Sequence, residues 1–316
     1  MATKRRDPRF TGKIKQPWSA DSLCPCGSSR RAADCCQLPN GLFRKQFTYP
    51  TAPLPQTGYA NACCYLRSTK NCSDKRSGEH FISASVLRIV NERHIKVKNL
   101  PWLAHGEIAE LQISKLRSHI LCKRHNEALS SLDQSAGAFF RAVRAMFDDI
   151  ANSKTLSRKP QWFLASGEEL ELWLVKTAFG LYESECFAHK NGNSPERLPI
   201  NPTILRAFQG ARIPKPCGLY LMATGDEQWA KRDAIDVSPM FSQRDKRMVG
   251  MSLAFMGLTF LILLDPRIAY PDPSGTYTFR PSAVQFRNAK RSHTIVLTWG
   301  DQPLQRAVLY TASRRG

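Results

Sequence analysis

The first residues that could do chemistry are four cysteines in the segment CPCGSSRRAADCC. They stand in two close pairs with the spacing C-x-C-x8-C-C, at Cys24, Cys26, Cys35 and Cys36. Four thiolates in two short-range pairs, joined by a loop that can fold back, suit tetrahedral zinc with Zn–S bonds of about 2.3 Å. A disulfide or a buried apolar cluster is the alternative that this segment alone leaves open.

The distribution of the other cysteines favours metal over disulfides. Seven of the ten cysteines precede residue 73, so they are clustered and not spread as a framework. The charged start MATKRRDPRF is not followed by the apolar stretch of a secretory signal, which predicts a cytoplasmic protein. In that reducing compartment, clustered thiols are typical of metal sites.

The cysteine segment resembles the SEC-C zinc motif, which reads CPCGSG, then a basic run, then CC or CH. The match covers residues 24–36 and departs from the motif at Ser29, where glycine is usual, and at AAD before the final pair. The resemblance implies a small docking module for a protein or ribosome surface. It implies no catalysis, because four thiolates leave no open coordination position on zinc.

A second group of possible ligands is spread over the next part of the chain. In order, these residues are Cys64, Cys72, Glu79, His80, Cys122, His125 and Asn126. A cysteine pair, an acidic residue with a histidine, and a second pair followed at once by asparagine and a helix resemble the HNH, or ββα-metal, nuclease family. The resemblance spans roughly residues 60–140.

This resemblance implies two metal sites. A structural zinc would be held by Cys64, Cys72, Cys122 and His125. In phosphodiester hydrolysis, His80 would act as the general base, and Glu79 and Asn126 would hold Mg²⁺ or Mn²⁺. Because Asn126 directly follows His125, the zinc would fix the catalytic loop relative to His80.

The second group also departs from the family pattern. Glu79 stands where Asp or His is more usual, and the first pair is widely spaced as C-x7-C, with Cys63 as an alternative to Cys64. Between His80 and Cys122 lie 41 residues, which requires an insertion. Asp133 is either a further metal ligand or a solvated helix residue.

Two helices are expected to position these residues. Apolar residues from Glu127 to Ile150 recur at three- and four-residue steps, which predicts one helix with a buried face. A second helix is predicted from the segment SGEELELWLVKTAFGLYES, which begins with capping-box spacing at Ser166 and Glu169. On it, Lys176 is expected to be a surface lysine, with a phosphate contact as the alternative.

The whole pattern predicts an α+β protein. We expect a basic segment with a zinc knuckle at 1–48, an HNH-like zinc module at 59–150, a helical segment at 151–200 and a β-rich part at 201–316. The apolar run GMSLAFMGLTFLILL, residues 250–264, is too short for a membrane span and predicts buried strands. Neither a phosphate-binding loop nor a dinucleotide fingerprint occurs, so ATP- or NAD-dependent activity has no support.

The charge indicates the class of partner. Lys and Arg number 46 against 26 Asp and Glu, which gives a net charge of +20 and favours nucleic acid, DNA in the first place, over an anionic membrane. A generally basic surface without such a partner is the alternative. The sequence therefore predicts a metal-dependent HNH-type endonuclease, with a catalytically inactive two-zinc nucleic-acid-binding or docking protein as the alternative.

Overall fold

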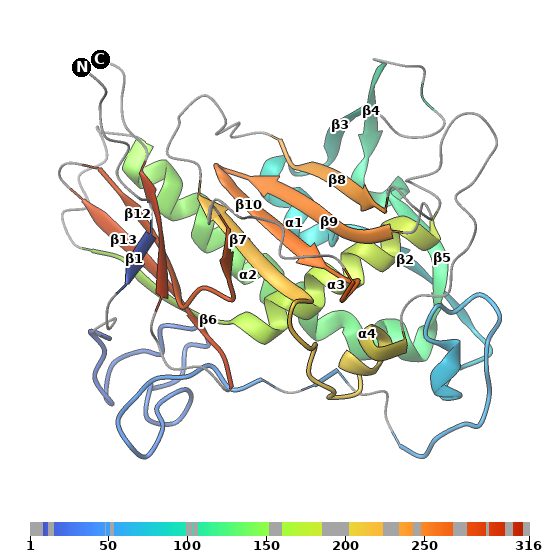
Figure 1. Ribbon diagram of the computed structural model, residues 1–316, viewed down its shortest axis with the longest axis horizontal. Coiled ribbons are helices and arrows are strands. Elements are labelled where there is room, and N and C mark those ends of the chain that lie inside the picture. Colours follow the sequence, from blue (N-terminus) through green and yellow to red (C-terminus); the bar gives the residue numbers. More distant parts are fainter. Residues whose placement is uncertain are drawn as a thin grey trace.

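The computed structural model describes residues 9–11, 16–47, 49–50, 54–98, 103, 107–151, 160–184, 202–223, 234–242, 248–267, 277–288, 291–300 and 306–311. Within these residues the protein is a mixed α+β structure with two larger sheets, two small two-stranded sheets and two long helices (Figure 1). None of the described helices is both long and apolar enough to cross a bilayer.

The two long helices are those that the apolar periodicity predicts. Helix α2 (Lys123–Ala151) starts directly after strand β5 (Arg117–Cys122), and its buried residues form one face. Helix α3 (Gly167–Glu183) begins at Ser166, whose hydroxyl accepts a hydrogen bond from the Glu169 amide, as expected for an N-cap. Two shorter helices are α1 (Ala84–Val90) and α4 (Pro202–Ala207), and single 3-10 turns lie at Arg67–Thr69 and Ile113–Lys115.

One five-stranded sheet is antiparallel and contains the predicted buried strands. Its order is β11 (Thr278–Phe279), β7 (Gly218–Ala223), β10 (Leu258–Leu263), β9 (Met248–Phe255) and β8 (Asp236–Phe241). The apolar run 250–264 thus forms two strands, joined by a two-residue turn in which both Met256 and Gly257 have positive φ. All five strands of this sheet lie within residues 201–316, for which the sequence predicts β structure.

The other five-stranded sheet is mixed. Its order is β1 (Arg9–Thr11), β14 (Arg306–Thr311), β12 (Ala283–Arg287), β13 (Ser292–Thr298) and β6 (Trp162–Ser166). Strand β6 lies in the segment for which only helix is predicted, and it pairs in parallel with β13. It forms at this edge because its short run WFLAS buries Leu164 and Ala165 before the helix begins.

The helices and the sheets share one large core. Helix α2 packs on α3 and on the antiparallel sheet through aromatic edge contacts, in which the ring of Phe140 lies 5.3 Å from Trp173, 5.3 Å from Phe255 and 5.5 Å from Phe260. Helix α3 contacts β10 of one sheet and β13 of the other. It is buried on all sides from Leu170 to Leu181.

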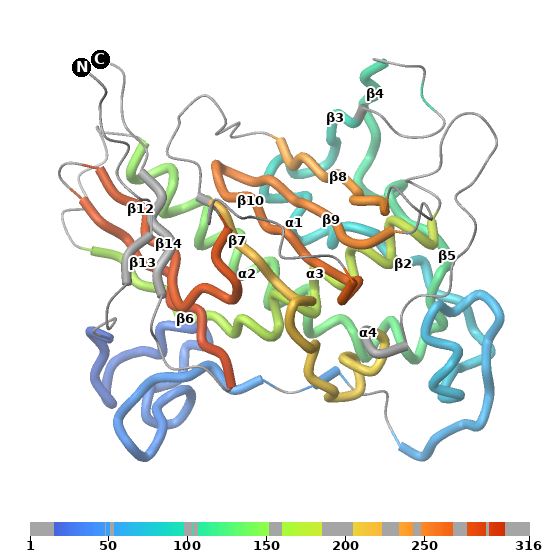
Figure 2. The backbone as a smooth tube through the Cα atoms, viewed as in Figure 1, coloured from blue at the N-terminus to red at the C-terminus, as the bar shows by residue number. Residues whose placement is uncertain are grey.

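The N-terminal part follows one edge of this body. In Figures 1 and 2 the first described loops lie beneath the mixed sheet, and the chain then runs along the lower edge to the opposite end, where β2 (Arg76–His80) pairs with β5. A hairpin, β3 (His94–Lys98) with β4 (Ile108–Gln112), lies in the predicted insertion between His80 and Cys122. The two cysteine groups are therefore held at opposite ends of the molecule.

Candidate metal centres

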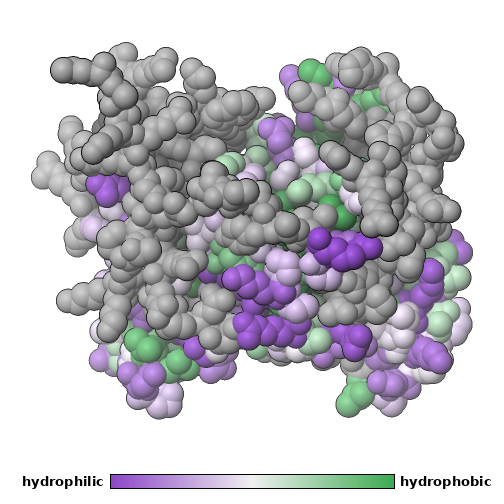
Figure 3. All heavy atoms as spheres, viewed as in Figure 1, coloured by the Kyte–Doolittle hydropathy of each residue, from purple (hydrophilic) through white to green (hydrophobic). Residues whose placement is uncertain are grey.

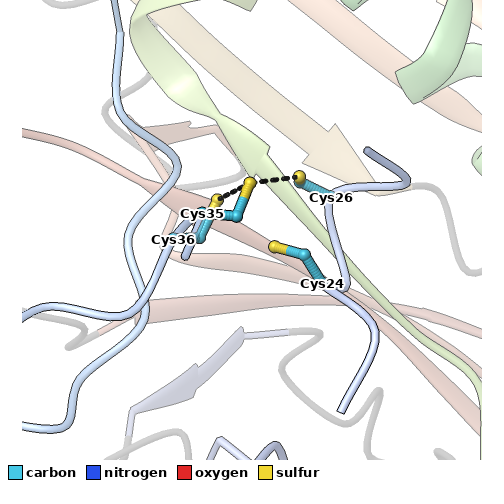
Figure 4. Close-up of side chains that lie close together, drawn as sticks. All are labelled: Cys24, Cys26, Cys35 and Cys36. Atoms are coloured by element: carbon cyan, nitrogen blue, oxygen red, sulfur yellow. Dashed lines mark hydrogen bonds between the residues drawn. The ribbon is translucent and has the colours of Figure 1, made fainter. Parts of the chain in front are cut away.

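The four N-terminal cysteines come together in one cluster. Their sulfurs lie within 4.8 Å of one another, and in Figure 4 they face a common centre from two loops. The Sγ–Sγ distances are 3.6 Å for Cys26 and Cys35 and 3.7 Å for Cys35 and Cys36. Sulfurs bound tetrahedrally to zinc would lie about 3.8 Å apart, given Zn–S bonds of about 2.3 Å. A disulfide would need about 2.05 Å, so the geometry fits zinc.

The ionisation of these thiols also favours a bound cation. Burial raises the pKa of Cys24 to about 11, whereas hydrogen bonds, chiefly from the Cys36 thiol, lower the pKa of Cys26 to about 4. Without a metal, one thiolate is thus stabilised at the expense of its neighbours. A divalent ion would allow all four to ionise, because each thiolate then has a positive partner.

The knuckle, residues 24–36, is built into the body of the protein. The Leu164 amide of edge strand β6 donates to the Pro25 carbonyl at 3.0 Å, and the cluster packs on Leu164 and Val296. The knuckle therefore covers part of a sheet edge that would otherwise present free backbone groups. Leu23 and Leu42 nearby remain exposed. Figure 3 shows hydrophobic side chains, in green, at the surface at the lower left, where the N-terminal loops lie in Figure 1.

The second cluster contains Cys64, Cys72, Cys122 and His125, the four residues that the family resemblance implies. The Nδ1 atom of His125 lies 3.4 Å from Cys64 Sγ, 3.7 Å from Cys72 Sγ and 3.2 Å from Cys122 Sγ. These distances fit one zinc held at about 2.0 Å by nitrogen and about 2.3 Å by sulfur. Cys64, and not its neighbour Cys63, points into the cluster.

The environment of His125 prepares it as a ligand. Burial, with a smaller effect of Arg124, lowers its pKa to about 4, so the ring is neutral. The Thr69 hydroxyl donates to the Leu66 carbonyl at 2.8 Å, so its oxygen accepts from His125 Nε2–H at 3.1 Å. This leaves the lone pair on Nδ1, facing the three sulfurs. No motif in the sequence points to this role of Thr69.

The cluster ties three separate elements together. Cys64 and Cys72 flank the 3-10 turn, Cys122 ends β5, and His125 lies in the first turn of α2. A metal here would lock the antiparallel pair β2–β5 to the start of the helix that follows it.

The three residues predicted to be catalytic lie on these elements, but each has its own surroundings. Glu79 is buried, and its Oε1 lies 2.5 Å from the Nζ atom of Lys176. The Asn126 side-chain amide donates to the Ser77 hydroxyl at 2.8 Å. His80 follows Glu79 on the strand, where successive side chains point to opposite faces. Glu79 and the Asn126 contact therefore lie on the face of the strand that the helices cover. His80 is half-buried beside Arg117.

His80 lies in a positively charged environment. Burial, followed by Arg117 and Arg88, lowers its pKa below the ordinary value. Its Nε2 atom is buried and makes no hydrogen bond with the described residues. The Arg117 side chain lies over Gly78, where an added Cβ would stand 3.2 Å from its Cδ.

Lys176 is not a surface residue, and that expectation is wrong. Only 3% of it is exposed, and its Nζ lies 2.6 Å from Asp133 Oδ2 as well as 2.5 Å from Glu79. Gly180, one turn further along α3, permits this approach, because an added Cβ would stand 3.2 Å from the Phe81 backbone. The apolar residues on every side of α3 are the sequence signal for a buried lysine.

In comparisons with known proteins, no family, no curated sequence and no solved structure matches this chain. The two zinc-type clusters rest on geometry. The resemblances to the SEC-C and HNH families stay predictions.

The residues predicted to hold Mg²⁺ or Mn²⁺ do not form a site for such an ion, in contrast to the two clusters that fit zinc. The Lys176 ammonium already neutralises the Glu79 carboxylate, and the Asn126 side chain is oriented by the hydrogen bond that its Nδ2 donates to Ser77. A hard divalent cation needs several oxygen ligands free to point at one centre. Among the described residues, the Glu79 carboxylate, which is the charged ligand predicted for this ion, is therefore already paired with a cation.

Proposed function

We propose that this protein is a two-zinc nucleic-acid-binding protein, in which the second zinc fixes a basic hairpin against its helix. The observation that carries the proposal is a group of arginines and a lysine around the zinc-pinned pair β2–β5. These residues, here called the hairpin patch, are Lys75, Arg76, Arg88 and Arg117.

The hairpin patch is available to phosphates. Its four residues are exposed, and none forms an ion pair with a carboxylate of another described residue. Arg76 lies opposite Cys122 and Arg117 lies opposite His80, so they stand about 13 Å apart along the strands. Duplex DNA carries one charge per about 1.7 Å of helix axis, so this span would meet several phosphates.

The net charge of the chain and the arginines of the hairpin patch both favour phosphate binding at this site. A net charge of +20 draws polyanions to the protein, and arginine side chains match phosphate oxygens with two parallel hydrogen bonds. Such contacts give affinity without reading the base sequence. The zinc would add rigidity, which lowers the cost of ordering the patch on binding.

The proposal is tested by fluorescence anisotropy with labelled single-stranded and duplex DNA at several salt concentrations. The variant Arg76→Gln/Arg117→Gln removes two charges from the patch. The matched control Arg206→Gln/Lys215→Gln removes two exposed charges from α4 and the loop that follows it. Each lost phosphate contact lowers the slope of log K against log salt by about 1.

We expect the patch variant to bind at least about tenfold more weakly, with a shallower salt slope by about 2. The control keeps the slope of the unmodified protein. Equal losses in both variants would show that only net charge matters. Binding that ignores salt would overturn the proposal and favour a docking or adaptor role for the knuckle, residues 24–36.

Metal-dependent cleavage is the second candidate, and one observation favours it. His80 lies opposite Arg117 of the patch, and its buried Nε2 makes no hydrogen bond with the described residues, so this nitrogen would be free to act as a general base once the site opens to substrate. Nicking of supercoiled plasmid in Mg²⁺ or Mn²⁺ that disappears in His80→Ala would establish an HNH-type endonuclease. If both proteins are inert while both keep two zinc ions, the centre serves binding alone.

A further inference from the structure

The pair of carboxylates beneath the hairpin already has a cation. Lys176 Nζ contacts Glu79 Oε1 at 2.5 Å and Asp133 Oδ2 at 2.6 Å, and the side chains of Lys176 and Glu79 are 4% and 6% exposed. This contact joins three elements, since Glu79 comes from β2, Asp133 from α2 and Lys176 from α3. An ammonium group, with three donors and one charge, thus bridges two carboxylates, of which that of Glu79 is buried and that of Asp133 is 26% exposed.

The other oxygen of Asp133 is also occupied. The Ser83 hydroxyl donates to Asp133 Oδ1, and Ser83 in turn accepts a hydrogen bond from Trp173 Nε1 at 2.6 Å. Trp173 is fully buried and Ser83 nearly so. Both oxygens of Asp133 and one oxygen of Glu79 are therefore already bound by protein donors.

We infer that the Lys176 ammonium is the resident cation of this centre, which keeps a divalent ion out, and that its removal opens a divalent-cation site between Glu79 and Asp133. An ion such as Mn²⁺ binds carboxylate oxygens at the positions where the ammonium now donates. The Lys176 ammonium and a divalent ion cannot occupy the space between the same two oxygens at once. The lysine is part of the folded core, so the exclusion is built into the packing of α3.

This inference bears on the proposed function, because a centre without a divalent ion would bind phosphates without hydrolysing them. It does not depend on that function. Its evidence is the buried ion pairs, and its test measures metal binding and stability. Failure of the nucleic-acid experiment would leave the metal test unaffected, and the reverse holds equally.

The test compares four zinc-loaded proteins by thermal unfolding with and without Mn²⁺ and by electron paramagnetic resonance of bound Mn²⁺. These are the unmodified chain, Glu79→Gln, Lys176→Met, and the triple variant Lys176→Met/Glu79→Gln/Asp133→Asn. Methionine keeps much of the length of lysine and leaves two uncompensated carboxylates. The triple variant keeps the shape and removes both charges.

We expect no Glu79-dependent Mn²⁺ binding and no change in Tm for the unmodified chain. For Lys176→Met we expect a lowered Tm, which Mn²⁺ at about a hundredfold excess over its Kd raises by about 5 °C, and one bound Mn²⁺. The triple variant should not respond to Mn²⁺. Folding of Lys176→Met only in the presence of Mn²⁺ would count as the same result.

Two outcomes would overturn the inference. One is Mn²⁺ bound by the unmodified chain and lost in Glu79→Gln, because the ammonium would then not exclude it. The other is a Lys176→Met protein that does not respond to Mn²⁺, whether it is folded or unfolded. These outcomes are read from the unmodified chain and from the two single variants, so they do not require the triple variant to fold.

Discussion

At the scale of single residues, His80 is kept neutral by its surroundings. Burial and the nearby Arg117 and Arg88 lower its pKa in the folded protein, whereas the unfolded residue titrates near 6.5. The unfolded chain therefore binds more protons between these two pKa values. Stability that depends on His80 must fall as the pH drops below about 6.5 and level off below the folded pKa.

This effect can be isolated by comparison with His80→Gln, which cannot titrate. We expect the free energy of unfolding of the unmodified chain, relative to the variant, to decrease as the pH is lowered through about 6.5. Urea denaturation across this range measures the difference. A relative stability that increases on acidification would mean that the folded protein protonates His80 readily, which would contradict the described environment.

Thr69 gives a second prediction at this scale, through the zinc ligand that it orients. Thr69→Val removes the acceptor for His125 Nε2–H, and loss of such an outer partner typically costs about 10–100-fold in metal affinity. Competition with a chromogenic chelator measures this loss. Thr69→Ser keeps the hydroxyl and should retain affinity. Equal affinities for all three proteins would show that Thr69 does not orient the ring.

At the scale of elements, α3 carries its charges in pairs. Besides Lys176, the helix buries Glu171, whose carboxylate accepts two hydrogen bonds from the Arg280 guanidinium at 2.8 and 3.0 Å. Burial raises the pKa of Glu171, and Arg280 opposes this rise. A charge left alone in such a place is costly because no water can replace its partner.

We expect Glu171→Leu to lower the free energy of unfolding by about 3–5 kcal/mol, because Arg280 loses its buried partner. The double variant Glu171→Leu/Arg280→Met should regain most of that loss. Chemical denaturation of the two variants provides the comparison. A double variant as unstable as the single one would show that the loss comes from packing and not from the unpaired charge.

The elements also show what the sequence can and cannot predict. Both long helices follow from apolar spacing and from the cap at Ser166, and the strands of residues 248–263 follow from one apolar run. Strand β6 is missed because its few residues gain their stability from pairing with β13, more than 100 residues away. Local patterns do not contain such a contact.

The same distinction applies to the site. The eight residues of the two clusters are found from residue types and spacing, because a zinc site would require four nitrogen or sulfur ligands at short range. Lys176 is misplaced because its partners, Glu79 and Asp133, are 97 and 43 residues away in the chain. Only the packing of α3 against β2 and α2 brings them together.

At the scale of the whole molecule, the two clusters hold down the parts of the chain that have least core of their own. The first attaches the basic N-terminal segment to the edge strand β6, and the second attaches the strand pair β2–β5 to α2. The large core between them extends from Cys64 to Trp299. Zinc would thus stabilise the two ends of a body whose middle is stabilised by apolar packing.

The central claim is that both clusters are zinc centres, and native mass spectrometry of the intact chain tests it most directly. We predict two zinc ions for each chain, one after Cys26→Ser/Cys35→Ser, and one after Cys64→Ser/Cys122→Ser. The unmodified protein should also show all its thiols as reduced. A chain without zinc, or one whose mass shows disulfides in place of either cluster, would contradict the account.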